Sequence, residues 1–142
     1  MPSKSRRETL VFLFLLVLAF GVRLYGLTYH SLWLDETVSV YLASFRFSEI
    51  FRQGMSLQEP NPPLYHLVLA AWMRLFGTSE AGARLLSVFA GTLYLPGVYI
   101  LARRLFSRRV ALIASVLAAV NPFLVWYSQE ARMYALVATL SV

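Results

Sequence analysis

An unbroken apolar run from Leu10 to Val22 constrains this chain more than any other feature. A surface helix of a soluble protein has an apolar stripe and a polar face, whereas this run has no polar face. The surrounding segment, about residues 9–27, is long enough to cross the hydrocarbon core at ~1.5 Å per residue, and we predict it as the first span. Basic residues precede it and no cleavage site of small residues follows, so we expect an uncleaved anchor rather than a signal peptide. We expect Arg23, about a turn from the far end, to extend to the interface.

Composition supports a membrane environment. The chain is 58% hydrophobic and only 14% charged, too little charge to cover a soluble domain of 142 residues. Its net charge of +6 would suggest nucleic acid in a soluble protein, but the basic residues flank apolar runs. Their role is therefore orientation in the bilayer, and we predict no nucleic-acid partner. The absence of Cys excludes disulfides and thiolate chemistry.

Two further segments, about residues 81–105 and 109–127, are long enough to span the membrane. Four arginines, between Arg103 and Arg109, lie in the short loop that joins them, and the positive-inside rule places this loop and the N-terminus in the cytoplasm. Both assignments hold only if the apolar segment 64–76, ~20 Å long as a helix, lies at the interface without crossing. Single cysteines at Ser39 and Ser107 would distinguish the two sides.

The sequence therefore predicts an all-α, multi-pass protein of the plasma membrane. The chain ends inside the apolar run 135–142 with no cap or charge, so we expect the N-terminal part of one longer transmembrane domain, inactive alone. It would comprise the first three spans and the start of a fourth, with a long outer loop at residues 28–80. The expected helices are about 9–27, 35–46, 62–76, 80–105, 109–127 and 129 onward.

The outer loop has a helical period of its own. Val38, Tyr41, Leu42 and Phe45 recur at i, i+3, i+4 and i+7, which predicts an amphipathic helix. A further short turn is expected from Ser48 to Phe51. Such helices lie on the surface of membrane lipid.

Adjacent carboxylates, Asp35 and Glu36, begin this amphipathic helix. In the simplest interpretation Asp35 caps the helix and Glu36 interacts with its positive N-terminal dipole. Alternatively, they provide a general base or a metal ligand at the lipid–water boundary. The two interpretations are compatible, because a cap fixes the position of its carboxylate.

Two other polar segments are candidates. The first is a rigid loop with Glu59 and Asn61 that leads to His66; it is either a simple turn or part of a site, and a lone His is more often an interfacial hydrogen-bonding residue than a ligand. The second carries Glu130 and Arg132, which we expect in the first turns of a helix. Either these two charges are incidental on a surface helix, or Arg132 binds a phosphate and Glu130 orients that phosphate or the sugar. We expect Asp35, Glu36, Glu130 and Arg132 to converge in one outward-facing cavity.

Together these segments resemble the family 39 glycosyltransferases of the GT-C superfamily. These are relatives of the dolichyl-phosphate-mannose protein mannosyltransferases and of the aminoarabinose transferases that modify lipid A. The resemblance runs along nearly all of this chain and covers the front of the family's membrane domain. It is carried by Trp33-Leu34-Asp35-Glu36, Asn61-Pro62-Pro63-Leu64-Tyr65, Ala102-Arg103-Arg104-Leu105-Phe106, Asn121-Pro122-Phe123 and Tyr127-Ser128-Gln129-Glu130-Ala131-Arg132-Met133-Tyr134.

The resemblance implies transfer of a sugar from a polyprenyl-phosphate carrier, outside the membrane, to an acceptor protein or glycolipid. Asp35 matches the family's first-loop catalytic acid, with Glu36 its companion. Arg132, and more weakly Arg84, would neutralise the phosphate. Asn61 stands where the family commonly has His, and it can hydrogen-bond but cannot act as a base. Glu59 is the nearest candidate for an acidic residue that is sometimes a metal ligand, so the pattern allows a divalent metal without requiring one.

Two other classes of function compete with a glycosyltransferase. Transporters place polar groups near the bilayer midplane, and the nearly uncharged spans of this chain argue against a transporter segment. A non-catalytic membrane anchor or structural subunit stays open.

Overall fold

The computed structural model describes residues 4–57 and 63–142, and within them the chain is helical, with no strand. The all-α prediction is confirmed. The helices are α1 (Lys4–Leu24), α2 (Leu34–Ser44), α3 (Phe47–Ser56), α4 (Pro63–Phe76), α5 (Glu80–Leu105), α6 (Arg108–Val120), α7 (Pro122–Ser128) and α8 (Tyr134–Leu140).

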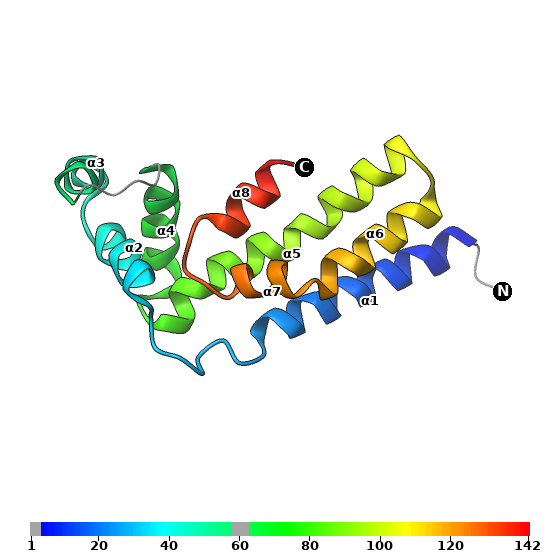
Figure 1. Ribbon diagram of the computed structural model, residues 1–142, viewed down its shortest axis with the longest axis horizontal. Coiled ribbons are helices and arrows are strands. Elements are labelled where there is room, and N and C mark those ends of the chain that lie inside the picture. The colour runs from blue at the N-terminus through cyan, green and yellow to red at the C-terminus, as the bar shows by residue number, and fades with distance from the viewer. Residues whose placement is uncertain (1–3, 58–62) are drawn as a thin grey trace.

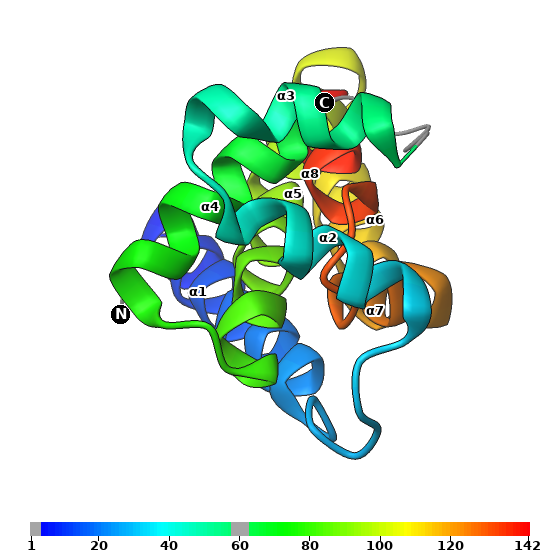
Figure 2. The same cartoon turned by 90° about the vertical axis from the view of Figure 1, so that its left-hand side faces the viewer.

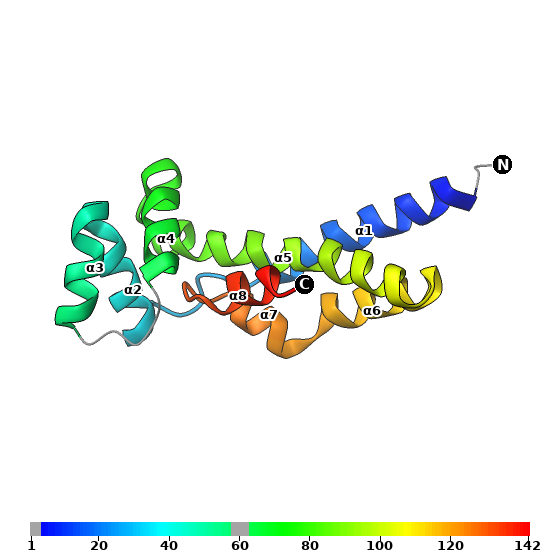
Figure 3. The ribbon, with the colours of Figure 1, turned by 90° about the horizontal axis from the view of Figure 1, so that it is seen from above.

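Helix α5 is the axis of an elongated molecule (Figures 1 and 3). Helices α1 and α6 run beside the half of α5 that leads to its C-terminus, while α2, α3 and α4 gather at its N-terminal end. Figure 2 shows these three helices in front of the long bundle. The short helices α7 and α8 pack on α5 between the two ends.

Each end has its own apolar core. At the end of α2–α4, Leu69 of α4 is fully buried, and the indole N–H of Trp72 donates to the carbonyl of Gly82 at 2.9 Å. Among the long helices the core is smaller, with Ala19 and Leu95 at its centre. The core of the α2–α4 end is formed by Ala43, Ile50, Tyr65, Leu69, Ala70, Met73, Ala83, Leu86 and Ala131.

The segment predicted as one straight span at 109–127 is broken. Helix α6 ends at Val120, and α7 continues at 58° to it. Pro122 lacks the N–H that would continue the α6 ladder, so it can bend or end this span, as predicted. The side chain of Asn121 accepts from the N–H groups of Phe123 and Leu124 and so begins α7 as a new helix.

The predicted number of spans is not confirmed. Of the described residues, only α5 is by itself long and apolar enough to cross a membrane, and α6 with α7 is a second candidate if the bent pair is one span. Helix α1 has 21 residues, but Arg6, Arg7 and Glu8 stand at one end and Arg23 at the other. Large apolar side chains of α1, α5 and α6 are nevertheless exposed, which is typical of helices that face lipid or further helices.

The first loop differs from its prediction in detail. Helix α2 begins at Leu34, and the residue that caps it is Glu36, whose carboxylate accepts from the N–H of Trp33; Asp35 does not cap it. The expected apolar stripe is incomplete, because Tyr41 is exposed while Ser39 is buried against the other helices. The short turn expected after Ser48 is the ten-residue helix α3.

Two further predictions are wrong, one for the segment after Ser128 and one for Arg23. No helix follows Ser128 directly: residues 129–133 are irregular, and α8 begins at Tyr134. The hydroxyl of Ser128 instead donates to the carbonyl of Leu124, within α7. Arg23 does not extend to the interface, because its side chain is completely buried.

The turn after α4 depends on Gly77, which has a φ of +89° and donates its N–H to the carbonyl of Met73. A Cβ at Gly77 or at Gly54, inside α3, would meet nothing within 4 Å. Gly77→Ala therefore isolates backbone strain and should lower the free energy of unfolding by about 1 kcal/mol. Gly54→Ala should raise it by about 0.5 kcal/mol, because alanine favours a helix.

Unfolding with a denaturing detergent measures both changes. Equal effects of the two substitutions would contradict the left-handed conformation assigned to Gly77.

Candidate active site

A buried ion pair between Glu36 and Arg84 anchors the first loop to α5. Nε of Arg84 donates to Oε1 of Glu36 at 2.8 Å, and one terminal nitrogen donates to Oε2 at 2.7 Å. The side chain of Glu36 is only 1% exposed, and that of Arg84 is only 5% exposed. A bidentate pair of this geometry fixes both distance and orientation.

The remaining hydrogen-bond donors of Arg84 are also used. Its terminal nitrogens donate to the carbonyls of Leu27, His30 and Ser31, which belong to the irregular segment between α1 and α2. With the two bonds to Glu36, these contacts engage all of the five N–H groups that a guanidinium has. No N–H of Arg84 remains for a phosphate, so the geometry favours a structural role over the phosphate contact predicted from the sequence.

Glu36 joins a second irregular segment to the same point. Its Oε1 accepts from the backbone N–H of Ala131 at 2.7 Å, and its Oε2 accepts from that of Trp33 at 3.0 Å. Burial alone raises the pKa of Glu36, but the hydrogen bonds from Arg84, Ala131 and Trp33 outweigh it and hold that pKa below the ordinary value. Glu36 is therefore a charged clamp. Each of its carboxylate oxygens already accepts two hydrogen bonds, which leaves no lone pair for a substrate.

Asp35, its neighbour, has the opposite environment. Its side chain is 70% exposed, and its Oδ2 lies 3.8 Å from a terminal nitrogen of Arg132. The other terminal nitrogen of Arg132 donates to the backbone carbonyl of Asp35 at 3.2 Å. Arg132 is thus held beside Asp35 by a backbone contact, while the carboxylate of Asp35 stays accessible to solvent.

These residues surround one cavity of about 420 Å³. The predicted convergence is confirmed, since Asp35 and Glu36 meet Glu130 and Arg132 there although about 95 residues separate the two pairs along the chain. Four aromatic side chains complete the wall. Trp33 belongs to the irregular segment before α2, and Trp126 belongs to α7. The cavity is lined by Trp33, Leu34, Asp35, Glu36, Trp126, Tyr127, Glu130, Arg132 and Tyr134.

Glu130 is held by an aromatic partner. The indole N–H of Trp126 donates to its Oε1 at 2.7 Å. Burial raises the pKa of Glu130, and the charge of Glu36 adds to this, while the Trp126 hydrogen bond and Arg132 oppose it. Glu130 therefore takes up a proton at higher pH than an ordinary glutamate, which is typical of carboxylates in functional sites.

The remaining predicted residues do not line this cavity or lie outside the described part of the chain. His66 is buried in α4 among the apolar core residues. Glu59 and Asn61 lie outside the described residues. Within residues 4–57 and 63–142, no group of three or more His, Asp or Glu side chains could hold a metal ion. The divalent metal that the family pattern allows stays untested.

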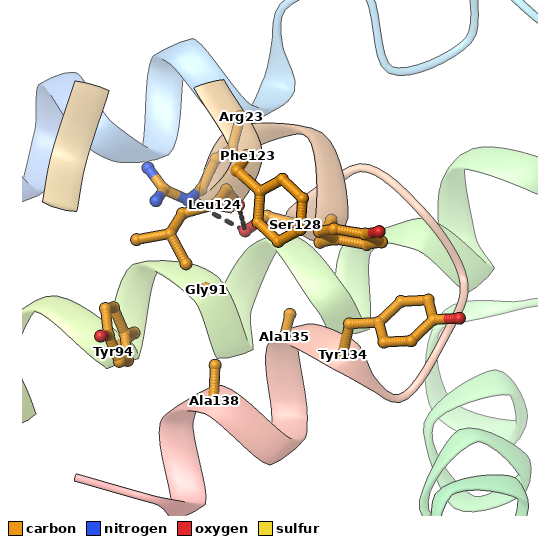
Figure 4. A pocket seen from close by; sticks show the side chains of 10 residues that line it. Arg23, Gly91, Tyr94, Phe123, Leu124, Ser128, Tyr134, Ala135 and Ala138 are labelled. Carbon is orange, nitrogen blue, oxygen red and sulfur yellow. Dashed lines mark hydrogen bonds between the residues drawn. The ribbon is translucent and has the colours of Figure 1, made fainter. Parts of the chain in front are cut away.

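A second, almost wholly apolar cavity of about 210 Å³ lies behind the same aromatic wall (Figure 4). Tyr127 and Tyr134, whose rings meet edge to face with centroids 4.6 Å apart, line both cavities. Arg23 lies at the edge of the apolar one. No pattern in the sequence predicted this cavity, because only the fold brings α5, α7 and α8 together. The tyrosines of these segments were its one signal in the sequence.

The polar cavity has an exposed carboxylate and a guanidinium, and an apolar cavity lies beside it; apolar walls with a few convergent polar groups are typical of a site for a small molecule. The family model described as dolichyl-phosphate-mannose-protein mannosyltransferase matches residues 60–141. The chain therefore belongs to this family, whose members are membrane glycosyltransferases of the GT-C type. The resemblance seen in the sequence is confirmed. Comparison with curated proteins and with solved structures yields no match.

The buried pair of Glu36 with Arg84 and the more exposed pair of Glu8 with Arg108 allow a matched comparison of their contributions to stability. Glu36→Gln should lower the free energy of unfolding by about 3 kcal/mol, because the buried charge of Arg84 then lacks an opposite charge. Glu8→Gln, which breaks the more exposed 3.2 Å pair with Arg108, should cost no more than about 1 kcal/mol. Because the pKa of Glu36 is lowered on folding, its stabilisation is complete above the ordinary value of 4.5 and is lost as pH falls below it.

Detergent unfolding at pH 7 and across the acid range measures both effects. The wild-type protein should lose stability toward low pH more steeply than Glu36→Gln does. Equal costs for the two substitutions at pH 7 would show that the buried pair is not a clamp.

Proposed function

We propose that this chain contributes the catalytic base and the phosphate contact of a glycosyltransferase that uses a polyprenyl-phosphate-linked sugar. The observation that carries the proposal is the pairing of Asp35 with Arg132 at 3.8 Å at the edge of one cavity. A transfer reaction of this kind needs a base for the acceptor and a cation for the leaving phosphate, close together. The family's name, which refers to dolichyl-phosphate mannose, supports this class of donor.

The reaction follows from the charges. The oxygen of an acceptor hydroxyl attacks the anomeric carbon of the sugar while the carboxylate of Asp35 takes the hydroxyl proton. The bond between that carbon and the phosphate oxygen breaks, and its electron pair leaves with the polyprenyl phosphate. The guanidinium of Arg132 neutralises the anion that departs. A single displacement inverts the configuration at the anomeric carbon.

The surrounding groups have supporting roles. Glu36 and Arg84 hold Asp35 in place and take no part in the chemistry. Glu130, beside Trp126, accepts hydrogen bonds from sugar hydroxyl groups, and the aromatic wall packs against the sugar ring. The apolar cavity behind Tyr127 and Tyr134 accommodates isoprenoid units next to the phosphate (Figure 4).

The proposal includes a topology. The chain crosses the membrane with α5 and the bent pair α6–α7, the candidates by length and composition. Helix α1 is a further span of the proposal, and the bent pair brings the chain back to the outer side. The N-terminus and the short turn after α5, which has two arginines in the helix end on each side, face the cytoplasm, and the cavity faces outward. The acceptor, a protein or a glycolipid, meets the donor there.

Catalysis and binding should separate in two variants of the full-length enzyme. Asp35→Asn keeps the shape and removes the base, so transfer from dolichyl-phosphate mannose should fall by about 10²–10⁴-fold with donor binding nearly unchanged. Arg132→Ala should weaken donor binding by about tenfold or more, because a charge-assisted contact is lost.

Arg109→Ala, at an exposed position in the first turn of α6, is the matched control and should change neither quantity. Rates are measured with radiolabelled donor and binding by its retention on purified enzyme. Wild-type turnover by Asp35→Asn would remove Asp35 as the base.

The topology can be tested by labelling single cysteines, because the chain has none of its own. Ser39, a natural choice from the sequence, is buried, so Ser31 is used in its place; Ser31 and Ser107 are both exposed. In intact cells a membrane-impermeant maleimide should label Ser31→Cys, and it should label Ser107→Cys only after permeabilisation. The reverse pattern would show that the orientation is inverted.

A further inference from the structure

The bend between α6 and α7 leaves backbone carbonyls without helical partners. In a continuous helix the carbonyl of Ala118 would accept from residue 122, but Pro122 has no N–H. The carbonyl of Ala119 would accept from Phe123, whose N–H is bound by the side chain of Asn121 instead. Such groups are costly to leave unpaired away from water.

Arg23 of α1 supplies the missing donors. One terminal nitrogen donates to the carbonyl of Ala118 at 3.4 Å, and the other donates to that of Ala119 at 3.2 Å and to that of Ala19 in its own helix at 3.1 Å. The side chain is completely buried. Its positive charge lies at the C-terminal end of α6, where the helix dipole is negative.

The same guanidinium also holds the far side of the bend. Its Nε donates to the hydroxyl of Ser128, the last residue of α7, at 3.2 Å, and that hydroxyl donates to the carbonyl of Leu124 (Figure 4). Gly91 of α5 makes room for this contact, since a Cβ there would overlap the hydroxyl of Ser128 and lie 3.2 Å from Nε of Arg23. Both helices that meet at the bend are thus fastened to one side chain.

The bend sets the position of the cavity wall. Trp126 and Tyr127 belong to α7, and Glu130 and Arg132 follow it directly. We infer that Arg23 is a positioning residue of the active site: by joining the carbonyls at the end of α6 to Ser128, it fixes the direction in which α7 delivers Arg132 to Asp35. Among the described residues, none of the ion pairs includes Arg23, so its charge serves the bend and not a carboxylate.

The structural part of this inference is independent of the reaction, and only its kinetic readout rests on the proposed function. Spin labels on cysteines at Tyr41 of α2 and Phe123 of α7, both exposed, report the separation of the two sides of the cavity. Arg23→Met should broaden and shift the distance distribution between them. Gly91→Ala should do the same with Arg23 intact, by displacing Ser128. Gly21→Ala, where a Cβ on α1 meets nothing within 4 Å, should leave it unchanged.

Kinetics on folded, full-length enzyme complete the test. Arg23→Met should lower kcat with dolichyl-phosphate mannose by about 100-fold per folded molecule, because a misplaced binding group costs that much. Arg23→Lys, with the charge but fewer donors, should recover part of it. A merely structural arginine would reduce the yield of folded protein and its melting temperature without changing kcat or the label distance.

That last result would overturn the inference. If Arg23→Met does not fold, Arg23→Lys and Gly91→Ala decide it by the same two measurements. If no variant, nor the wild-type enzyme, transfers sugar, the proposed function fails, while the label distances still accept or reject the role of Arg23.

Discussion

The pairing of Glu36 with Arg84 is the contact on which the site depends. Two irregular segments, the chain between α1 and α2 and the segment that contains Ala131, meet there with the start of α2. Without a charged group at the centre, their carbonyl and N–H groups would need water in a region that the helices exclude. A buried ion pair of this kind adds more to the uniqueness of an arrangement than to its net stability.

Arg84 and Arg23 solve the same physical problem at two places. Each is buried, and each directs its N–H groups at backbone carbonyls that no helix satisfies: Arg84 in the segment between α1 and α2, Arg23 at the bend of α6 and α7. A guanidinium suits this task because it has five donors in a fixed plane and stays charged when buried. Irregular backbone beside the polar cavity thus relies on arginines from neighbouring helices, whereas in the proposed function Arg132 is the arginine that binds the donor phosphate.

Asp35 and Glu36 are adjacent in the sequence, but their carboxylates have different surroundings. On a helix, neighbouring residues point about 100° apart, so one carboxylate faces Arg84 and Ala131 while the other faces the cavity. The sequence marked both as candidates for catalysis and also marked the helix N-terminus that they occupy. It could not assign to Glu36 the role of joining the first loop to α5 and to the segment of Ala131, because that role depends on partners 48 and 95 residues away.

Apolar period and length, together with Pro122 and the charges at the ends of the apolar runs, determined the all-α fold and most helix boundaries, because these are local properties of the chain. The order of short polar motifs determined the family. Only the tertiary structure decided that residues 129–133 stay irregular, that Arg23 and Arg84 are buried, and that Tyr127 and Tyr134 separate a polar from an apolar cavity. These features depend on contacts between residues far apart in the chain, and a local pattern carries no information about which distant carbonyl or carboxylate will meet a given guanidinium.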